Sequence, residues 1–156
     1  MLNIGEIKRF IEEDALSAKK RDARKGQDYY EAEHDIRNYR LFYYDADGIL
    51  REDKTRSNIK IAHPFFTELV DQETQYMLSG EKPFIKSNIP ELQSELNEYF
   101  NDDFEAELNE TLTGAIAKGF DYMYAYRNAD DRLSFQNADS IGVVEVRAKD
   151  TDDATE

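Results

Sequence analysis

One helix pattern between residues 102 and 119 constrains the fold of this chain more than any other feature. Its apolar side chains recur at every fourth position, which places them on one helix face and predicts that this face is buried. Asp102 or Asp103 is expected to cap the first turn, and Gly119 is expected to end the helix. The apolar stripe consists of Phe104, Leu108, Leu112 and Ile116.

A hairpin pattern follows this helix directly. Residues 120–126 and 132–135 flank a polar turn at residues 128–131, and their alternating side chains predict an antiparallel β-hairpin. Residues 141–146 are expected to add a third strand. The period of two places four aromatic residues on one face of the hairpin: Phe120, Tyr122, Tyr124 and Tyr126.

Helical spacing also dominates the first hundred residues. Asn3 is expected to cap a first helix and Asp14 a second, which continues past Gly26 to about Arg37. A third helix is expected to begin at His63 and Pro64, with Gly80 as a left-handed cap and Pro83 preventing resumption. A fourth is expected over residues 90–99. Six residues of the third helix are expected to share one face: Phe66, Leu69, Val70, Glu73, Tyr76 and Met77.

The linking segments lack a helical period. Residues 39–58 predict an extended arm with a turn at residues 45–48 and at most a small hairpin, and residues 84–86 predict a short strand or extended link. The fold class is therefore α+β, mainly helical with a C-terminal antiparallel β-hairpin or small sheet. One domain is expected over residues 1–146, followed by an acidic, disordered tail at residues 147–156.

Composition excludes several classes of protein. The chain has no cysteine, so it forms neither disulfides nor thiolate zinc sites, and no apolar run approaches the roughly 18 to 20 residues that span a bilayer. Its formal charge of −14 argues against tight wrapping of a nucleic acid backbone. The basic cluster between Lys19 and Lys25 spreads around a helix and is interpreted as a solvated face rather than a phosphate-binding surface.

The sequence contains few residues that could form a catalytic, metal-binding or cofactor-binding site. His34 has no second histidine at helical spacing, and His63 precedes a proline at a helix start, so both favour ordinary surface or capping roles. The sequence of residues 45–48 places its glycine too early for a calcium-binding EF-hand loop, and residues 79–82 lack the glycines of a phosphate-binding loop. No catalytic, cofactor-binding or metal-binding residue is predicted, and no enzyme activity or cofactor is expected.

Two other features have simple explanations. Neighbouring acids are expected by composition, since the chain holds 34 acidic residues, and an acidic pair at a helix start is explained by capping and the helix dipole. Asn109 begins a glycosylation sequon within a predicted helix and is discounted. The acidic pairs are Asp102 with Asp103, Asp130 with Asp131, and Asp152 with Asp153.

Clusters of tyrosine and phenylalanine are more informative. Aromatic residues with a polar tip are enriched where subunits meet, although core packing explains about half of such residues equally well. One cluster lies on the hairpin, at Tyr122, Tyr124 and Tyr126. The other includes Tyr29, Tyr30, Tyr39, Phe42, Tyr43 and Tyr44.

The order and spacing of several such signals resemble the N-terminal part of the portal proteins of tailed bacteriophages with siphophage-type tails. The resemblance covers roughly residues 27–146. It rests on Tyr29-Tyr30, on Tyr43-Tyr44-Asp-Ala-Asp-Gly48, on residues 58–83 with Val70-Asp71-Gln72 and Gln75-Tyr76 before Gly80 and Pro83, and on Asp103-Phe104 to Gly119 with the tyrosine-rich hairpin.

The resemblance implies a structural subunit of a homo-oligomeric ring, a dodecamer in the full-length protein, at the portal vertex of the virion. DNA is packaged and ejected through such a head-tail connector ring without sequence-specific binding. Capsid and scaffolding proteins, the terminase motor and head-completion proteins are the implied partners, and assembly is expected in the bacterial cytoplasm without a membrane. Portals continue into stem, clip and crown regions, so this chain corresponds to the peripheral wing and is expected to be monomeric or weakly associating alone.

Two alternatives remain open from the residues themselves. The first is a stand-alone acidic protein that binds a basic partner or mimics DNA, although its acids interleave with Lys and Arg over residues 12–37. The second is a small metal-dependent hydrolase that uses carboxylates alone. Such an enzyme should gain thermal stability from magnesium or manganese.

Overall fold

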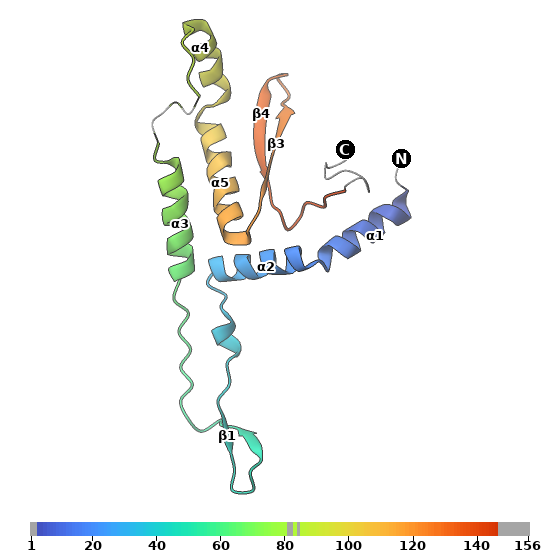
Figure 1. The fold of residues 1–156 in the computed structure, drawn as a ribbon, viewed down its shortest axis with the longest axis vertical. Helices are drawn as coiled ribbons and strands as arrows, with labels where there is room; N and C mark the ends of the chain where they lie inside the picture. The colour runs from blue at the N-terminus through green and yellow to red at the C-terminus, as the bar shows by residue number, and fades with distance from the viewer. Residues whose placement is uncertain (1–2, 81–82, 84, 147–156) are drawn as a thin grey trace.

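The computed structural model describes residues 3–80, 83 and 85–146, and its helices and hairpins form an elongated molecule (Figure 1). Helix α2 lies across the ends of α3 and α5, the β3–β4 hairpin packs along α5, and the β1–β2 hairpin lies far from this body. This arrangement confirms the α+β class. The elements are α1 (Ile4–Ala15), α2 (Ala18–Tyr30), the 3-10 helix η1 (Asp35–Asn38), β1 (Phe42–Tyr44), β2 (Leu50–Glu52), α3 (Phe65–Leu78), α4 (Pro90–Tyr99), α5 (Asp102–Lys118), β3 (Tyr122–Arg127) and β4 (Leu133–Ala138).

The first helix begins as predicted. The Asn3 side chain accepts a hydrogen bond from the Glu6 amide at 2.9 Å, and the Glu6 carboxylate accepts one from the Asn3 amide at 2.8 Å. This reciprocal pair is a capping box, which satisfies amides that the first helical turn leaves without partners. The cap at Asn3 is therefore confirmed.

The second helix differs from the prediction at both ends. Ser17, not Asp14, is its N-cap, because the Ser17 hydroxyl accepts the Lys20 amide whereas the Asp14 carboxylate pairs with the Lys20 ammonium. The helix passes through Gly26 but ends at Tyr30, and the expected continuation to Arg37 is wrong. Ala32 adopts a left-handed conformation with φ of 58°, which stops the helix before the separate turn η1.

The third helix differs from the prediction at its C-terminal cap. Gly80 is not in the left-handed conformation. The helix ends at Leu78, and the hydroxyl of its C-cap residue Ser79 donates to the Tyr76 carbonyl at 2.7 Å. Val70 and Thr74 are buried, whereas Leu69 is 64% and Tyr76 81% exposed. The packed side of the helix therefore includes Val70 of the predicted face together with Thr74, which lies outside that face. No strand is assigned at Ile85 and Lys86, and Phe84 lies outside the described residues.

Helix α5 and the following hairpin largely match the sequence patterns. Asn101 caps α5 instead of the predicted Asp102 or Asp103, because its side-chain oxygen accepts the Asp103 and Phe104 amides at 3.0 and 3.1 Å. Gly119 ends the helix with φ of 86°, as predicted, and β3 pairs antiparallel with β4 in a register that sets Tyr124 opposite Gln136. The stripe from Phe104 to Ile116 is half-buried, since the narrow hairpin covers only part of it.

The expected third strand at residues 141–146 is wrong. Within the described residues, this segment forms a turn at residues 140–142 and then continues without strand pairing. Backbone carbonyls of Ser140, Ile141 and Val143 instead accept hydrogen bonds from Lys20 of α2. Carbonyls that turn toward one ammonium group cannot also point along a strand ladder.

Small residues let the helices of the body approach one another closely. A Cβ atom added at Gly26 of α2 would lie 2.1 Å from the Ala117 carbonyl of α5, so only glycine fits this crossing. Ala23 on the same helix is fully buried, as is most of Ala117. Few large apolar side chains are buried among the described residues, so the body leaves much apolar surface uncovered.

Candidate functional site

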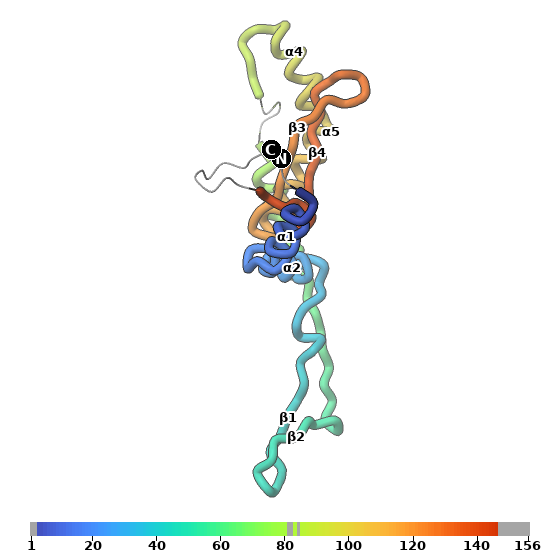
Figure 2. Tube along the Cα trace, turned by 90° about the vertical axis from the view of Figure 1, so that its right-hand side faces the viewer, coloured from blue at the N-terminus to red at the C-terminus, as the bar shows by residue number. Residues whose placement is uncertain are grey.

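An extended arm, residues 39–64, projects from the body between α2 and α3 (Figure 2). Its tip is the β1–β2 hairpin, in which Phe42 pairs with Glu52 and Tyr44 with Leu50. Its two legs are joined by side chains: Asn58 donates to the Tyr39 carbonyl at 3.0 Å, and Lys60 donates to the Arg37 carbonyl at 2.7 Å. The predicted arm and small hairpin are therefore confirmed.

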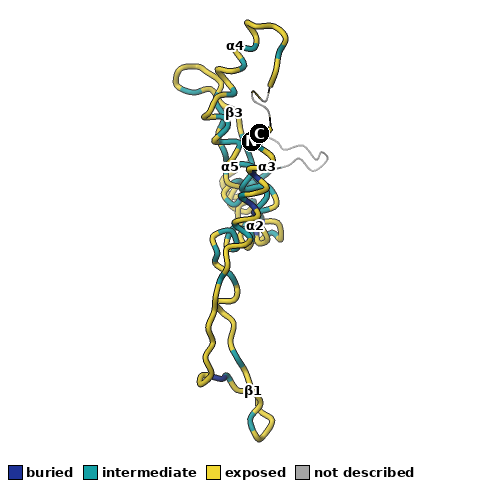
Figure 3. Tube along the Cα trace, turned by 90° about the vertical axis from the view of Figure 1, so that its left-hand side faces the viewer, coloured by how far each residue is buried: buried dark blue, intermediate teal, exposed yellow. Residues whose placement is uncertain are grey.

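The arm carries bulky apolar side chains on its outside. None of its apolar side chains is buried, and Figure 3 shows the arm exposed along most of its length. Several large apolar side chains left exposed on one segment are typical of places where proteins bind other molecules. Eight large side chains of the arm are at least 42% exposed: Tyr39, Phe42, Tyr43, Tyr44, Ile49, Leu50, Ile59 and Ile61.

The other aromatic cluster lies on the β3–β4 hairpin and is less exposed. Tyr124 and Tyr126 are 47% and 40% exposed with ring centres 5.7 Å apart, and the Tyr124 hydroxyl donates to Gln136 across the strands at 2.7 Å. Tyr122 is half-buried and bonds to the Glu145 carboxylate. The shared face predicted for these aromatic residues fits these contacts.

Tyr29 and Tyr30 belong to the body rather than to the arm. The Tyr30 hydroxyl donates to Asp71 of α3 at 2.9 Å, and burial together with this bond raises the pKa of Tyr30. The Tyr29 hydroxyl donates to Asp35 at 3.0 Å, and this bond raises the pKa of Tyr29. These two tyrosines fix the base of the arm to the helices.

Two aspartates hold the arm in its bent shape. Asp45 accepts the amides of Ile49 and Asp47 and pairs with Arg51, and the Ile49 amide, followed by Arg51, holds the pKa of Asp45 below its usual range. Asp53 accepts the hydroxyl and amide of Thr55 at 2.8 and 2.9 Å, and these bonds lower its pKa. Both carboxylates stabilise the hairpin while they are ionised.

The arm is therefore expected to lose its order in acid. Folding lowers the pKa values of Asp45 and Asp53. Their contribution to the stability of the arm is therefore fully present above the pKa of an unfolded aspartate, about 4, and is lost as the pH falls through the lower pKa values of the folded state. Amide NMR signals of Asp47, Ile49 and Thr55 report this change. The variant with both Asp45→Asn and Asp53→Asn should lose most of the acid dependence of these signals. Signals that change only together with those of α5 would contradict the prediction.

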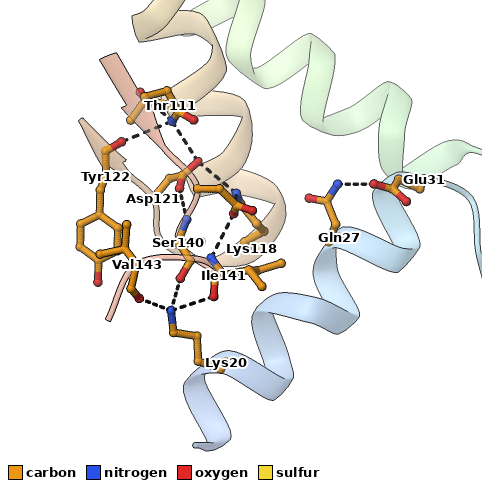
Figure 4. Close-up of polar contacts among 12 residues, drawn as sticks. Lys20, Gln27, Glu31, Thr111, Lys118, Asp121, Tyr122, Ser140, Ile141 and Val143 are labelled. Atoms are coloured by element: carbon orange, nitrogen blue, oxygen red, sulfur yellow. Dashed lines mark hydrogen bonds and ion pairs between the residues drawn. The ribbon is translucent and has the colours of Figure 1, made fainter. Parts of the chain in front are cut away.

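A buried polar junction lies where α5, β4 and the C-terminal segment meet (Figure 4). The Asp121 carboxylate accepts the Ser140 amide at 2.6 Å and the Asn137 side chain at 3.2 Å, and it lies 3.1 Å from the Lys118 ammonium. The side chains of Asp121 and Lys118 are 2% and 6% exposed. A Cβ atom at Gly114 would lie 1.9 Å from the carboxylate, so the glycine makes room for it.

Lys20 holds the other end of this junction. Its side chain is 2% exposed, and its ammonium group donates to the carbonyls of Ser140, Ile141 and Val143 and pairs with Asp14 at 3.2 Å (Figure 4). The interpretation of residues 19–25 as a solvated face is thus wrong for Lys20. No local pattern distinguishes Lys20 from its exposed neighbours, because the carbonyls that enclose it lie 120 residues later in the chain.

The other candidate residues lie in separate parts of the structure and form no common site. The His34 ring contacts Tyr29 in a tilted arrangement, with 4.9 Å between ring centres, and its Nε2 atom is buried without a hydrogen-bond partner in the described part of the chain. His63 stacks on Phe65 at 5.3 Å, and residues 45–48 form the arm's turn. Asn109 is exposed on α5. Asp131 pairs with Arg127 at 3.0 Å, whereas Asp152, Asp153 and residues 81–82 lie outside the described residues.

The body also contains a cavity between two of its helices. A polar cavity of about 280 Å³ lies between α2 and α5, lined in part by Gln27, Thr113 and Lys118. Across residues 3–80, 83 and 85–146, no three His, Asp or Glu side chains gather closely enough to hold a metal ion. No helix in this part of the chain has the length and apolar character needed to cross a membrane.

An elongated body with little buried apolar surface and a projecting aromatic arm is typical of proteins that assemble with other chains. Comparison with known families identifies the family to which the chain belongs. Residues 10–154 match the family described as phage portal protein, SPP1 Gp6-like. The chain belongs to this family. It is 35% identical over 111 residues to the portal protein of Bacillus phage SPP1, an alignment that covers 71% of this chain and 22% of that relative.

Proposed function

We propose that this chain is a structural part of a phage portal ring, the head-tail connector through which DNA is packaged and later ejected. The observation that carries the proposal is the family match over residues 10–154. The chain spans about a fifth of the relative's length, so the ring, its partners and its place in the virion are inferred from the family. No catalytic residue is assigned, and the motor that hydrolyses ATP is a separate protein.

The distribution of charge does not favour adhesion of DNA to this part of the ring. Residues 90–110, which include α4 and the first half of α5, hold eight acidic and no basic residues. Such a surface repels phosphates and limits adhesion of DNA. Elsewhere many carboxylates pair with Lys or Arg, as Glu145 does with Lys19 at 3.0 Å. A protein that mimics DNA would instead present regularly spaced, unpaired carboxylates in place of phosphates, so this pairing argues against that alternative.

The test begins by sequencing the gene beyond the codon for Glu156. The protein is then expressed at the full length that this gene encodes. We expect electron microscopy to show rings with a central channel, and light scattering to give a molar mass that corresponds to about a dozen subunits. The 156-residue chain alone should remain a monomer or associate weakly. A full-length product that stays monomeric at high concentration would refute the proposal.

A further inference from the structure

The outer edge of strand β3 is free of backbone partners. Strand β3 pairs with β4 alone in a two-stranded sheet. The Asn128 amide donates to the Arg132 carbonyl at 2.9 Å beside the turn, and this bond fixes which residues of the hairpin exchange hydrogen bonds across the strands. In that alternation the amides and carbonyls of Met123, Ala125 and Arg127 point away from β4. Within the described part of the chain, these groups have no hydrogen-bond partner.

The other edge of the hairpin is covered. The Asn137 amide, which points away from β3, donates to the Glu107 carboxylate of α5 at 2.6 Å, so α5 closes the edge of β4. Strand β3 is left as the open edge, and residues 124–127 are exposed. It is six residues long and contains neither lysine nor proline, which commonly protect an edge strand from pairing. An unprotected edge of this kind is a template for a further strand.

The described part of the chain ends on the open side of β3. After β4 the chain turns at residues 140–142, and the Glu145 carboxylate accepts a hydrogen bond from the Tyr122 hydroxyl at the start of β3. Figure 1 shows this segment leaving the hairpin on the side away from α5. The alignment covers only 22% of the portal protein of Bacillus phage SPP1. Because the chain resembles the N-terminal part of portal proteins, most of a full-length protein would follow this segment.

We propose that a strand from the polypeptide after residue 156 adds to the outer edge of β3 in the same subunit. The inference rests on the proposed function, which makes this chain part of a longer portal protein. Main-chain hydrogen bonds to the free edge supply the affinity of such strand addition, and alternate side chains supply its specificity. One face of the added strand lies beside Tyr124 and Tyr126, which are 47% and 40% exposed. We therefore expect apolar or β-branched residues at alternate positions of the added strand.

Amide hydrogen exchange in the 156-residue chain and in the full-length protein tests the added strand. In the 156-residue chain the amides of Met123, Ala125 and Arg127 lack an acceptor and should exchange fast, whereas those of Tyr124 and Tyr126 bond across the hairpin and should be protected. In the full-length protein the three edge amides should exchange roughly tenfold more slowly or slower still. Mass spectrometry with fragmentation that resolves single residues measures both proteins. Equal exchange at the edge in the two proteins would overturn the inference.

Two proline variants form a matched pair. Proline has no amide hydrogen, and an edge strand tolerates it where the missing N–H faces outward. Ala125→Pro should therefore leave the thermal midpoint of the 156-residue chain near wild type, yet restore fast exchange at Met123 and Arg127 in the full-length protein. The control Tyr126→Pro removes a hydrogen bond to Ser134 within the hairpin and should lower the midpoint of both proteins. A full-length Ala125→Pro protein whose edge stays protected would contradict strand addition.

Electron cryo-microscopy of the full-length ring shows which subunit supplies the strand. A strand traced to the same polypeptide supports the inference, and one traced to a neighbouring copy overturns it. The outcomes also separate this inference from the proposed function. Rings in which the edge of β3 exchanges fast would overturn strand addition and leave the ring intact. A full-length protein that protects this edge but forms no ring would defeat the proposed function and leave strand addition standing.

Discussion

Replacing Asp121 by alanine is expected to lower the free energy of unfolding of the 156-residue chain by about 3–5 kcal/mol. The change removes one partner of a buried ion pair and leaves the Ser140 amide without its acceptor, while Lys118 keeps Asp139 at 2.7 Å. Buried groups that lose their partner keep the full cost of desolvation. Urea denaturation followed by circular dichroism measures the loss.

Asp139→Ala is the matched control. Asp139 pairs with the same ammonium group as Asp121, but its side chain is 60% exposed. Because an exposed ion pair contributes at most about 1 kcal/mol, this variant should remain close to wild type. Equal losses for the two variants would contradict the assignment of Asp121 as the buried centre of the junction.

The contrast between local and long-range structure explains which parts of the fold could be predicted from the sequence. Helix α5 and its end at Gly119 follow from side-chain spacing and from the freedom of glycine at positive φ, both properties of a few consecutive residues. The β3–β4 hairpin follows from local alternation in the same way. These elements were predicted nearly to their ends.

Errors arose where distant residues decide the conformation. Residues 141–146 have the composition of a strand, yet their first carbonyls are held by Lys20 from α2. The apolar positions of α3 do not distinguish the side that α5 covers from the side left open, so their spacing does not show that Thr74 is buried and Leu69 exposed. Sequence spacing defines a helix face, but only packing shows whether that face is covered.

The candidate site was predicted in part for the same reason. The aromatic composition of residues 39–44 indicated a contact surface, and the exposure of Tyr43 and Tyr44 fits that interpretation. An apolar groove of the body, by contrast, joins α1 to residues 142–146, which are more than 125 positions apart in the sequence. No local pattern could have shown that these segments form one surface.

Lys20→Met should cost about 3 kcal/mol or more of the free energy of unfolding. Methionine keeps the apolar length of the side chain but removes the ammonium group, so the carbonyls of Ser140 and Val143 lose a buried donor and Asp14 loses its ion-pair partner. Hydrogen exchange should show a second effect, faster exchange at the Ser140 and Val143 amides than in wild type. Chemical denaturation and exchange therefore report the same anchor independently.

Lys19→Met separates the role of Lys20 from a general loss of positive charge. Lys19 is 51% exposed at its side chain, pairs with Glu145 at 3.0 Å, and lies over the Phe120 ring at 3.9 Å. We expect it to cost about 1 kcal/mol, with exchange at Ser140 unchanged. If both lysine variants behaved alike, the carbonyls around Lys20 would not be an anchor. If only Lys20→Met releases the segment, a single helix residue fixes the direction in which the chain leaves the β3–β4 hairpin, and with it one wall of the apolar groove beside α1.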